Sequence, residues 1–122
     1  MILVDTSVWI DHFRSTNVVL LDLLAKSSVL THASIVGELA CGNLRQRKQI
    51  LNDLKSLPSA ESATDDEVFE LIEKHKLWGR GIGWIDSHLI ASALITNCRL
   101  WTLDRKLGQA AARAGVKVFR VN

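Results

Sequence analysis

Residues 84–107 have the sequence WIDSHLIASALITNCRLWTLDRKL, which predicts a helix, a turn, a short strand and the start of a second helix. The helical part carries apolar residues at the spacing of one helix face: Leu89, Ile90, Ala93 and Leu94. Asp86 extends this face backwards, because residues three and four apart lie on the same side of a helix. Asp104 follows a short apolar run at 100–103, which we expect to form a buried strand. Two carboxylates are therefore expected near one edge of a sheet.

Each of these acids also has a purely structural interpretation. Asp86 would be favoured in the first turn of a helix, where the helix dipole stabilises a negative charge. Asp104 would serve as the N-cap of a helix that begins at Arg105. The rest of the chain has to decide between a structural and a chemical role for the two residues.

The beginning of the chain repeats the pattern of a strand followed by an acid. Residues 2–4 are a continuous apolar run, typical of a strand buried on both faces of a parallel sheet, and Asp5 follows directly. The next elements are expected in the order helix, helix, strand and helix, at 8–13, 18–26, 29–31 and 34–41. In the last of these, Glu38 lies at the edge of the apolar face. Its carboxylate either faces the sheet or stays in water, since burying an unpaired charge is costly.

The second half of the chain continues to alternate helices with short apolar runs. A helix is expected over 45–57, and Thr64 with Glu67 predicts a capping box at the start of another. A helix over 105–114 and a last strand over 116–121 complete the prediction. This alternation indicates an α/β fold, with a short parallel β-sheet flanked by α-helices and residues 1–122 as a single domain.

The composition excludes several classes of protein. The 122 residues are 48% hydrophobic with one proline, and the net charge of +2 is too small to indicate nucleic-acid binding by itself. Cys41 and Cys98 stand alone, so they predict neither a disulfide framework nor a zinc site. No apolar run is long enough to span a bilayer, and the N-terminal sequence does not resemble a signal peptide. We therefore expect a protein of the reducing cytoplasm with no membrane partner.

The predicted topology gathers the acids at one place. In open parallel sheets the ligand crevice lies beyond the carboxyl ends of the strands, where Asp5 and Asp104 belong. Asp86 and Glu38 are expected on helix faces that converge on the same crevice. Four carboxylates in one pocket resist joint ionisation unless a cation is present. Oxygen ligands without cysteine or histidine favour Mg²⁺, with Mn²⁺ as a second possibility.

These same residues carry a family resemblance. The segments V-D-T-S at 4–7, V-G-E-L-A-x-G at 36–42, W-I-D-x-x-L-I-A-S-A-L at 84–94 and L-x-T-L-D at 100–104 together resemble a PIN domain. More narrowly, the chain resembles the VapC-type toxins of bacterial type II toxin–antitoxin modules. The resemblance implies that the acidic catalytic and metal site consists of Asp5, Glu38, Asp86 and Asp104. It also implies supporting roles for Thr6 and Thr102.

The function implied by this resemblance is metal-dependent endoribonucleolytic cleavage. Arg80, Arg105 and Lys106 are candidates for contacts with RNA phosphates. The family further implies a homodimer and a cognate VapB-type antitoxin that covers the site. The first helix carries Trp9, Ile10 and Phe13, more large apolar surface than one core-facing stripe requires, and we expect the antitoxin to dock near it. All three residues could instead belong to the core.

Two features depart from the family pattern, and one rival function stays open. Ser87 stands where alanine is common, and no further acid follows Asp104 closely, which leaves the number of metal ions undecided. A haloacid-dehalogenase-type hydrolase would need an acid at Ser7, and a receiver-type domain would need an acidic pair where Thr6 stands. The remaining alternative is a non-catalytic α/β binding module, in which the acids are helix caps and rim charges.

Overall fold

The chain folds around a small parallel sheet. The computed structural model describes residues 1–121, so Asn122, the last residue of the expected domain, lies outside the described range. Within that range the sheet has the strand order β2-β1-β3, with strands β1 (Ile2–Val4), β2 (Val29–Leu30) and β3 (Arg99–Trp101). Leu3 on the central strand pairs with Leu30 on one side and with Leu100 on the other. The α/β class expected from the sequence is confirmed.

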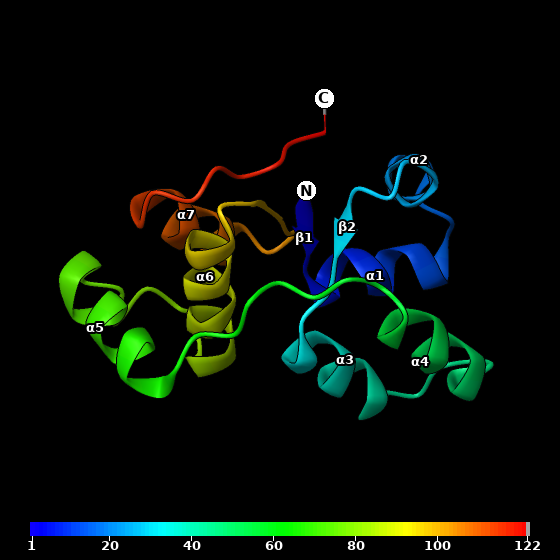
Figure 1. Cartoon of the computed structure of the whole chain (residues 1–122), viewed down its shortest axis with the longest axis horizontal. Coiled ribbons are helices and arrows are strands. Elements are labelled where there is room, and N and C mark those ends of the chain that lie inside the picture. Colours follow the sequence, from blue (N-terminus) through cyan, green and yellow to red (C-terminus); the bar gives the residue numbers. More distant parts are fainter. Residues whose placement is uncertain (122) are drawn as a thin grey trace.

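Seven helices connect and cover these strands in residues 1–121. Those on the β2 side are α1 (Thr6–Arg14), α2 (Val18–Ala25), α3 (Ala33–Ala40) and α4 (Arg47–Lys55). Those on the β3 side are α5 (Asp65–His75), α6 (Trp84–Thr96) and α7 (Arg105–Arg113). The sheet thus lies between two groups of helices (Figure 1), and its strands all run in the same direction.

The core is built on the central strand and on α6. Leu3 and Val4 of β1 are fully buried, as is Leu100 of β3. On α6, burial extends around most of the helix, because α6 packs against both α5 and β3. Leu94, which the sequence places on the apolar face, is 37% exposed instead. Ser87 and Ser92 take part in the buried surface of this helix.

At the C-terminal side of the chain one predicted strand is wrong and another has different bounds. The segment 116–121 forms no strand but a single bridge between Val118 and Leu100. Phe119 then packs against Trp101, with ring centroids 5.0 Å apart, rather than continuing a ladder. The strand expected at 100–103 is confirmed as β3, but it begins one residue earlier, at Arg99, and ends at Trp101. Beyond it the Leu103 amide donates to the Ser7 hydroxyl at 2.9 Å, which takes the backbone out of the sheet.

Several other boundaries differ by one or more residues, and two of them have a visible cause. The helix expected at 45–57 begins only at Arg47, since Gln46 adopts a left-handed conformation with φ of 52°. The strand expected at 29–31 ends at Leu30, and Thr31 instead forms an isolated bridge with Ser59. The capping box at Thr64 and Glu67 is confirmed, with both reciprocal bonds present.

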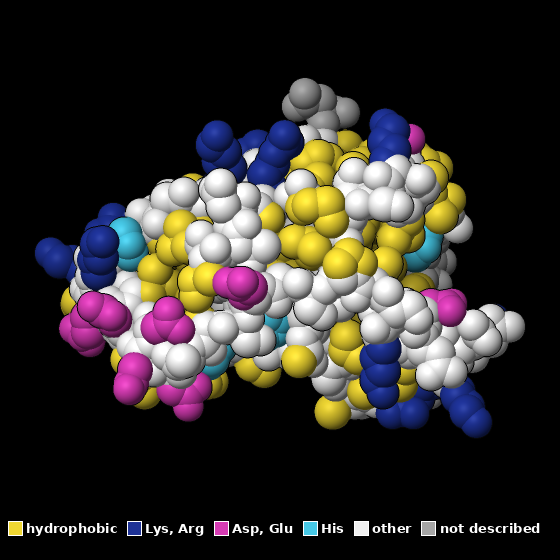
Figure 2. Space-filling view, in the orientation of Figure 1, with side chains coloured by type: hydrophobic (Ala, Val, Ile, Leu, Met, Phe, Trp, Pro, Cys, Tyr) yellow, Lys and Arg dark blue, Asp and Glu magenta, His cyan; other side chains and the backbone are white. Residues whose placement is uncertain are grey.

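Charge is unevenly distributed over the surface. Asp and Glu side chains gather over α5, whereas Lys and Arg side chains gather near α4 and along the edge where the chain ends (Figure 2). None of the helices in residues 1–121 has the length and apolar character needed to cross a membrane.

Candidate metal centre

Asp5 is the most deeply placed of the predicted site residues. It follows β1 directly and is 6% exposed. Although it occupies the N-cap position of α1, its side chain makes no capping hydrogen bond. One carboxylate oxygen, Oδ2, accepts hydrogen bonds from Thr102 Oγ1 at 2.7 Å and from Ser7 Oγ at 2.8 Å. The other oxygen, Oδ1, accepts no hydrogen bond from the described residues and is available to a cation.

Asp104 is the N-cap of α7, and Asp86, in the first turn of α6, bonds back to the N-cap residue Gly83. Oδ1 of Asp104 accepts the backbone N–H groups of Lys106 at 2.9 Å and Leu107 at 3.2 Å, at the start of α7. Oδ2 of Asp86 accepts the N–H of Gly83 at 3.2 Å, at the start of α6. Each cap uses one oxygen of the carboxylate, so capping and cation binding do not exclude each other.

Glu38 lies on α3 with its side chain exposed at the rim of the site. Its Oε1 accepts a hydrogen bond from Thr6 Oγ1 at 3.3 Å. Thr6 therefore supports Glu38, whereas Thr102 supports Asp5. Among the described residues, each of these carboxylates thus has one oxygen in a hydrogen bond and one oxygen free: Asp5, Glu38, Asp86 and Asp104.

The fold brings Glu38 and Asp86 within electrostatic reach of each other and of Asp5, and Asp86 within reach of Asp104. Partial burial is the main cause that raises the pKa of Glu38, and the charges of Asp5 and Asp86 raise this pKa further. Partial burial also raises the pKa of Asp86, against the Gly83 hydrogen bond, and Asp5 and Asp104 add to the rise. In residues 1–121 no three such side chains stand at the spacing of a formed metal centre. The arrangement is a cluster of mutually repelling anions that a cation would draw together.

The raised pKa values of Glu38 and Asp86 predict a pH dependence of the metal-free protein. A raised pKa means that the folded state binds the proton more tightly than the unfolded state does. The resulting stabilisation is complete below the ordinary values of 4.5 for glutamate and 3.8 for aspartate, and is lost as pH rises through the raised values. In EDTA, Glu38→Gln should therefore be more stable than wild type at neutral pH, with the difference shrinking towards pH 4.

Urea unfolding between pH 8 and pH 4 measures this difference. Glu70→Gln, on the exposed face of α5, is the matched control and should follow wild type. If the free energy of unfolding of Glu38→Gln differs from that of wild type by the same amount at every pH, the charge of Glu38 does not destabilise the folded protein.

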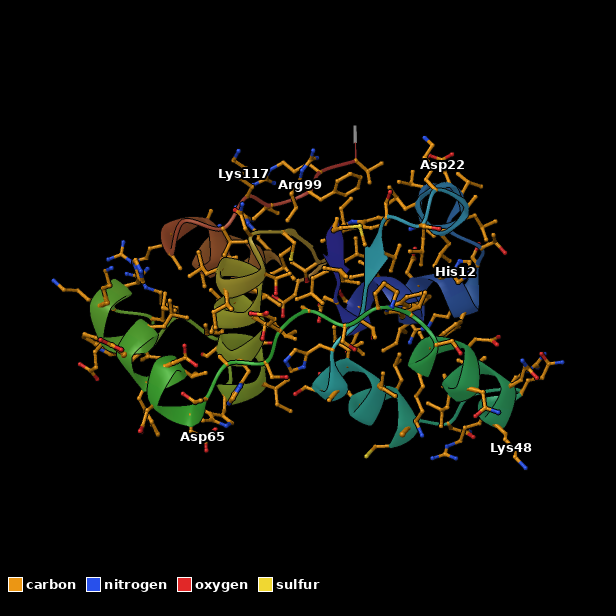
Figure 3. The ribbon with its side chains drawn as sticks, viewed as in Figure 1. His12, Asp22, Lys48, Asp65, Arg99 and Lys117 are labelled. Carbon is orange, nitrogen blue, oxygen red and sulfur yellow. The ribbon has the colours of Figure 1, made fainter. Side chains whose placement is uncertain are left out.

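The three basic candidates differ in their surroundings. Arg80 donates its Nε hydrogen to the carbonyl of Lys76 at 2.7 Å, which fixes part of its guanidinium to the end of α5. Arg105 and Lys106 are exposed at the start of α7, directly after Asp104. The Lys106 side chain lies across Gly81 in the loop before Asp86, so close that a Cβ atom on Gly81 would stand 2.5 Å from the Lys106 Cδ. Lys48, by contrast, lies on α4 at the far side of the molecule (Figure 3).

Ser7 is the site residue that sequence reasoning missed. In the sequence Ser7 is only the position where a haloacid-dehalogenase-type hydrolase would need an acid, yet in the structure its hydroxyl contacts both Asp5 and the β3–α7 turn. The available signal is the short spacing, because Ser7 lies two residues after Asp5 and its hydroxyl can donate to a carboxylate. The contact with the β3–α7 turn has no signal in the local sequence.

The sequence of the chain matches a family of known proteins. The PIN domain model matches residues 2–113, so the chain belongs to the PIN-domain family. The chain is also similar to two proteins called Ribonuclease VapC32 from Mycobacterium tuberculosis, strains CDC 1551 / Oshkosh and ATCC 25618 / H37Rv. Each is 44% identical over 117 residues, covering 95% of this chain and 94% of the relative. The VapC-type resemblance seen in the sequence is confirmed.

Proposed function

We propose that this protein is a metal-dependent endoribonuclease that acts as the toxin of a VapBC-type toxin–antitoxin module. The observation that carries the proposal is a group of carboxylates whose charges act on one another, each with one oxygen free of hydrogen bonds: Asp5, Glu38, Asp86 and Asp104. The similarity to ribonucleases of the VapC type supports RNA as the substrate.

The donor set fits a hard divalent cation. All four candidate ligands are carboxylate oxygens, which suit Mg²⁺ or Mn²⁺ rather than a soft metal. When bound, such an ion polarises a phosphoryl oxygen and lowers the pKa of an attacking water. The protein contributes Asp5, which is buried and hydrogen-bonded, and the exposed Glu38, whose carboxylate accepts the Thr6 hydroxyl. Arg105 and Lys106 would hold RNA phosphates beside Asp104 by charge.

The test of this function is RNA cleavage by the purified protein. Cleavage should require Mg²⁺ or Mn²⁺ and stop on addition of EDTA. Mapping the 5′ ends of cellular RNA after brief induction then identifies the substrate. The capping bonds of Asp86 and Asp104 favour the alternative of a non-catalytic binding module. That alternative predicts neither cleavage nor stabilisation by the metal.

The substitution Asp104→Asn is expected to separate the helix-capping role of Asp104 from its proposed metal-binding role. The amide oxygen of asparagine can accept the same two N–H groups, so the α7 cap is kept. Removing the charge relieves repulsion with Asp86, and the metal-free melting temperature should rise. The stabilisation by Mg²⁺ should shrink, by about 1.4 kcal/mol for each tenfold loss of affinity when Mg²⁺ is in excess.

Melting curves of wild type and Asp104→Asn, each in EDTA and in Mg²⁺, provide the measurement. Equal Mg²⁺-induced shifts in the two proteins would remove Asp104 from the metal site and leave it as a helix cap.

The proposed partner is a cognate antitoxin that docks beside α1. Trp9 is 4% exposed and belongs to the core, but Ile10 is 38% exposed. Ile10 and the partly buried Phe13 line a cavity of about 510 Å³ that reaches from α1 to Glu38. Arg14 and Arg45 stand on its walls, so an apolar segment with acidic neighbours would fit it. A segment bound there would reach the metal site.

Hydrogen exchange tests the docking site. Backbone amides of α1 should exchange more slowly when the antitoxin is bound, because the cavity is then covered. The distant helix α5 serves as the internal control. Unchanged exchange in α1 on binding would place the antitoxin elsewhere. From the family resemblance we also propose that the toxin acts in the cytoplasm and that it forms a homodimer. Light scattering of the purified chain measures the molar mass and so tests the homodimer.

A further inference from the structure

The Asp5 carboxylate is held by a chain of hydrogen bonds that starts at the backbone after β3. The amide of Leu103 donates to Ser7 Oγ at 2.9 Å, and the amide of Asp104 donates to Thr102 Oγ1 at 3.0 Å. Each hydroxyl in turn donates to Oδ2 of Asp5, at 2.8 Å from Ser7 and 2.7 Å from Thr102. Two backbone N–H groups of the β3–α7 turn are thereby linked to one carboxylate oxygen.

The count of protons fixes the direction of these bonds. A hydroxyl group carries one proton, and each hydroxyl here already accepts an N–H group. The 3.3 Å contact between Ser7 Oγ and Thr102 Oγ1 is longer than either bond to Asp5. A hydroxyl also forms a stronger hydrogen bond to a charged carboxylate than to another hydroxyl. Both protons are therefore directed to Oδ2 of Asp5. That oxygen is saturated, and only Oδ1 remains open.

We propose that Ser7 is a positioning residue, which together with Thr102 holds Asp5 in one orientation so that Asp5 binds the metal through Oδ1 alone. This inference rests on the proposed metal-dependent function. Ser7 acts through Asp5 and touches neither metal nor RNA. It also joins the two strand–helix junctions of the site, since Ser7 lies in the first turn of α1 and Leu103 lies between β3 and α7. Loss of the hydroxyl should free the carboxylate to rotate and to turn Oδ1 away from the site.

The test measures the affinity of the full chain, without antitoxin, for Mn²⁺ as the probe. Free Mn²⁺ is followed by electron paramagnetic resonance. Ser7→Ala should weaken Mn²⁺ binding by about 10-fold to 100-fold, the range for outer partners of metal ligands. Ser7→Thr keeps the hydroxyl and should retain most of the affinity. Ser92→Ala is the matched control, since Ser92 is fully buried and its hydroxyl has no partner among the described residues.

A second background separates positioning from a general structural role. In an Asp5→Asn protein, Ser7→Ala should change Mn²⁺ affinity far less than in wild type, because the ligand through which Ser7 acts is already lost. If Ser7→Ala does not fold, Ser7→Cys carries the test, since a thiol keeps the shape and is a weaker donor. An intermediate loss of Mn²⁺ affinity is then expected.

The outcomes distinguish this inference from the function on which it rests. If wild type binds Mn²⁺ and cleaves RNA, and Ser7→Ala binds Mn²⁺ as tightly as wild type, the positioning role of Ser7 is overturned alone. An equal loss of affinity in the Asp5→Asn background would also overturn it, because Ser7 would then act by another route. If wild type neither binds Mn²⁺ nor cleaves RNA, both proposals fail together.

Discussion

Asp5→Asn is expected to reduce metal-dependent RNA cleavage by at least about 100-fold, since even outer partners of metal ligands cost up to this much when removed. Asp5 is the least exposed of the four acids, and its Oδ1 is the free oxygen. An amide lacks the charge needed to hold a divalent cation. The fold should survive, because the amide oxygen of asparagine can still accept the hydroxyls of Ser7 and Thr102.

Cleavage of a defined RNA by equal amounts of purified protein, in Mg²⁺ and in EDTA, provides the measurement. Circular dichroism and melting confirm that the variant is folded. Asp22→Asn is the matched control, because Asp22 lies on α2, where it pairs with Lys26 at 2.8 Å (Figure 3). Undiminished cleavage by Asp5→Asn would defeat the assignment of Asp5 to the metal site, whatever the result for the control.

Asp86→Asn is expected to reduce cleavage about as strongly as Asp5→Asn does. The same substitution should also stabilise the metal-free protein. Partial burial is the main cause that raises the pKa of Asp86, and the charges of Asp5 and Asp104 raise it further, while the Gly83 hydrogen bond lowers it. A net rise shows that the fold disfavours the charged form, so a neutral side chain of the same shape should be tolerated better. The amide oxygen of asparagine can keep the bond to the Gly83 amide. Gain of stability with loss of function is the trade expected of a strained site.

Urea unfolding in EDTA at several pH values measures the gain. The difference between Asp86→Asn and wild type should be largest at neutral pH. It should vanish as pH falls below 3.8, the ordinary value for aspartate, where Asp86 is protonated in the folded and the unfolded state alike. A variant that is less stable than wild type at neutral pH would show that Asp86 serves the fold through its charge, as a helix-dipole residue.

Much of the fold could be predicted from local patterns. The apolar run Ile2–Val4 forms the buried central strand, and the helix expected around Leu89 and Ile90 begins at Trp84 with Asp86 in its first turn. The capping box at Thr64 could be predicted because its two partners lie three residues apart in the sequence. These features depend on the chain within one or two helical turns, where spacing determines which groups can meet.

The outcomes at 116–121 and at the end of β3 depend on partners far away in the chain. The segment 116–121 has the composition of a strand, but it makes only one bridge to Leu100, and a strand exists only where a ladder of bonds continues. The predicted strand at 100–103 stops at Trp101 because Leu103 is bonded to Ser7 across the site. Neither outcome is visible in the spacing of apolar residues.

The candidate site divides in the same way. The sequence by itself determined which acidic residues are candidates and that Asp5 and Asp104 follow buried strands. It also placed these two acids near each other, because the ligand crevice of a parallel sheet lies at the carboxyl ends of its strands. Only the tertiary structure decided which oxygen of each carboxylate is free. Asp104 uses Oδ1 for its own helix, a local bond, whereas Oδ2 of Asp5 is held by Thr102 from the other end of the chain. Thr102 and Asp5 are far apart in the chain, and their hydrogen bond forms only because β1 pairs with β3 and so brings the ends of these two strands together.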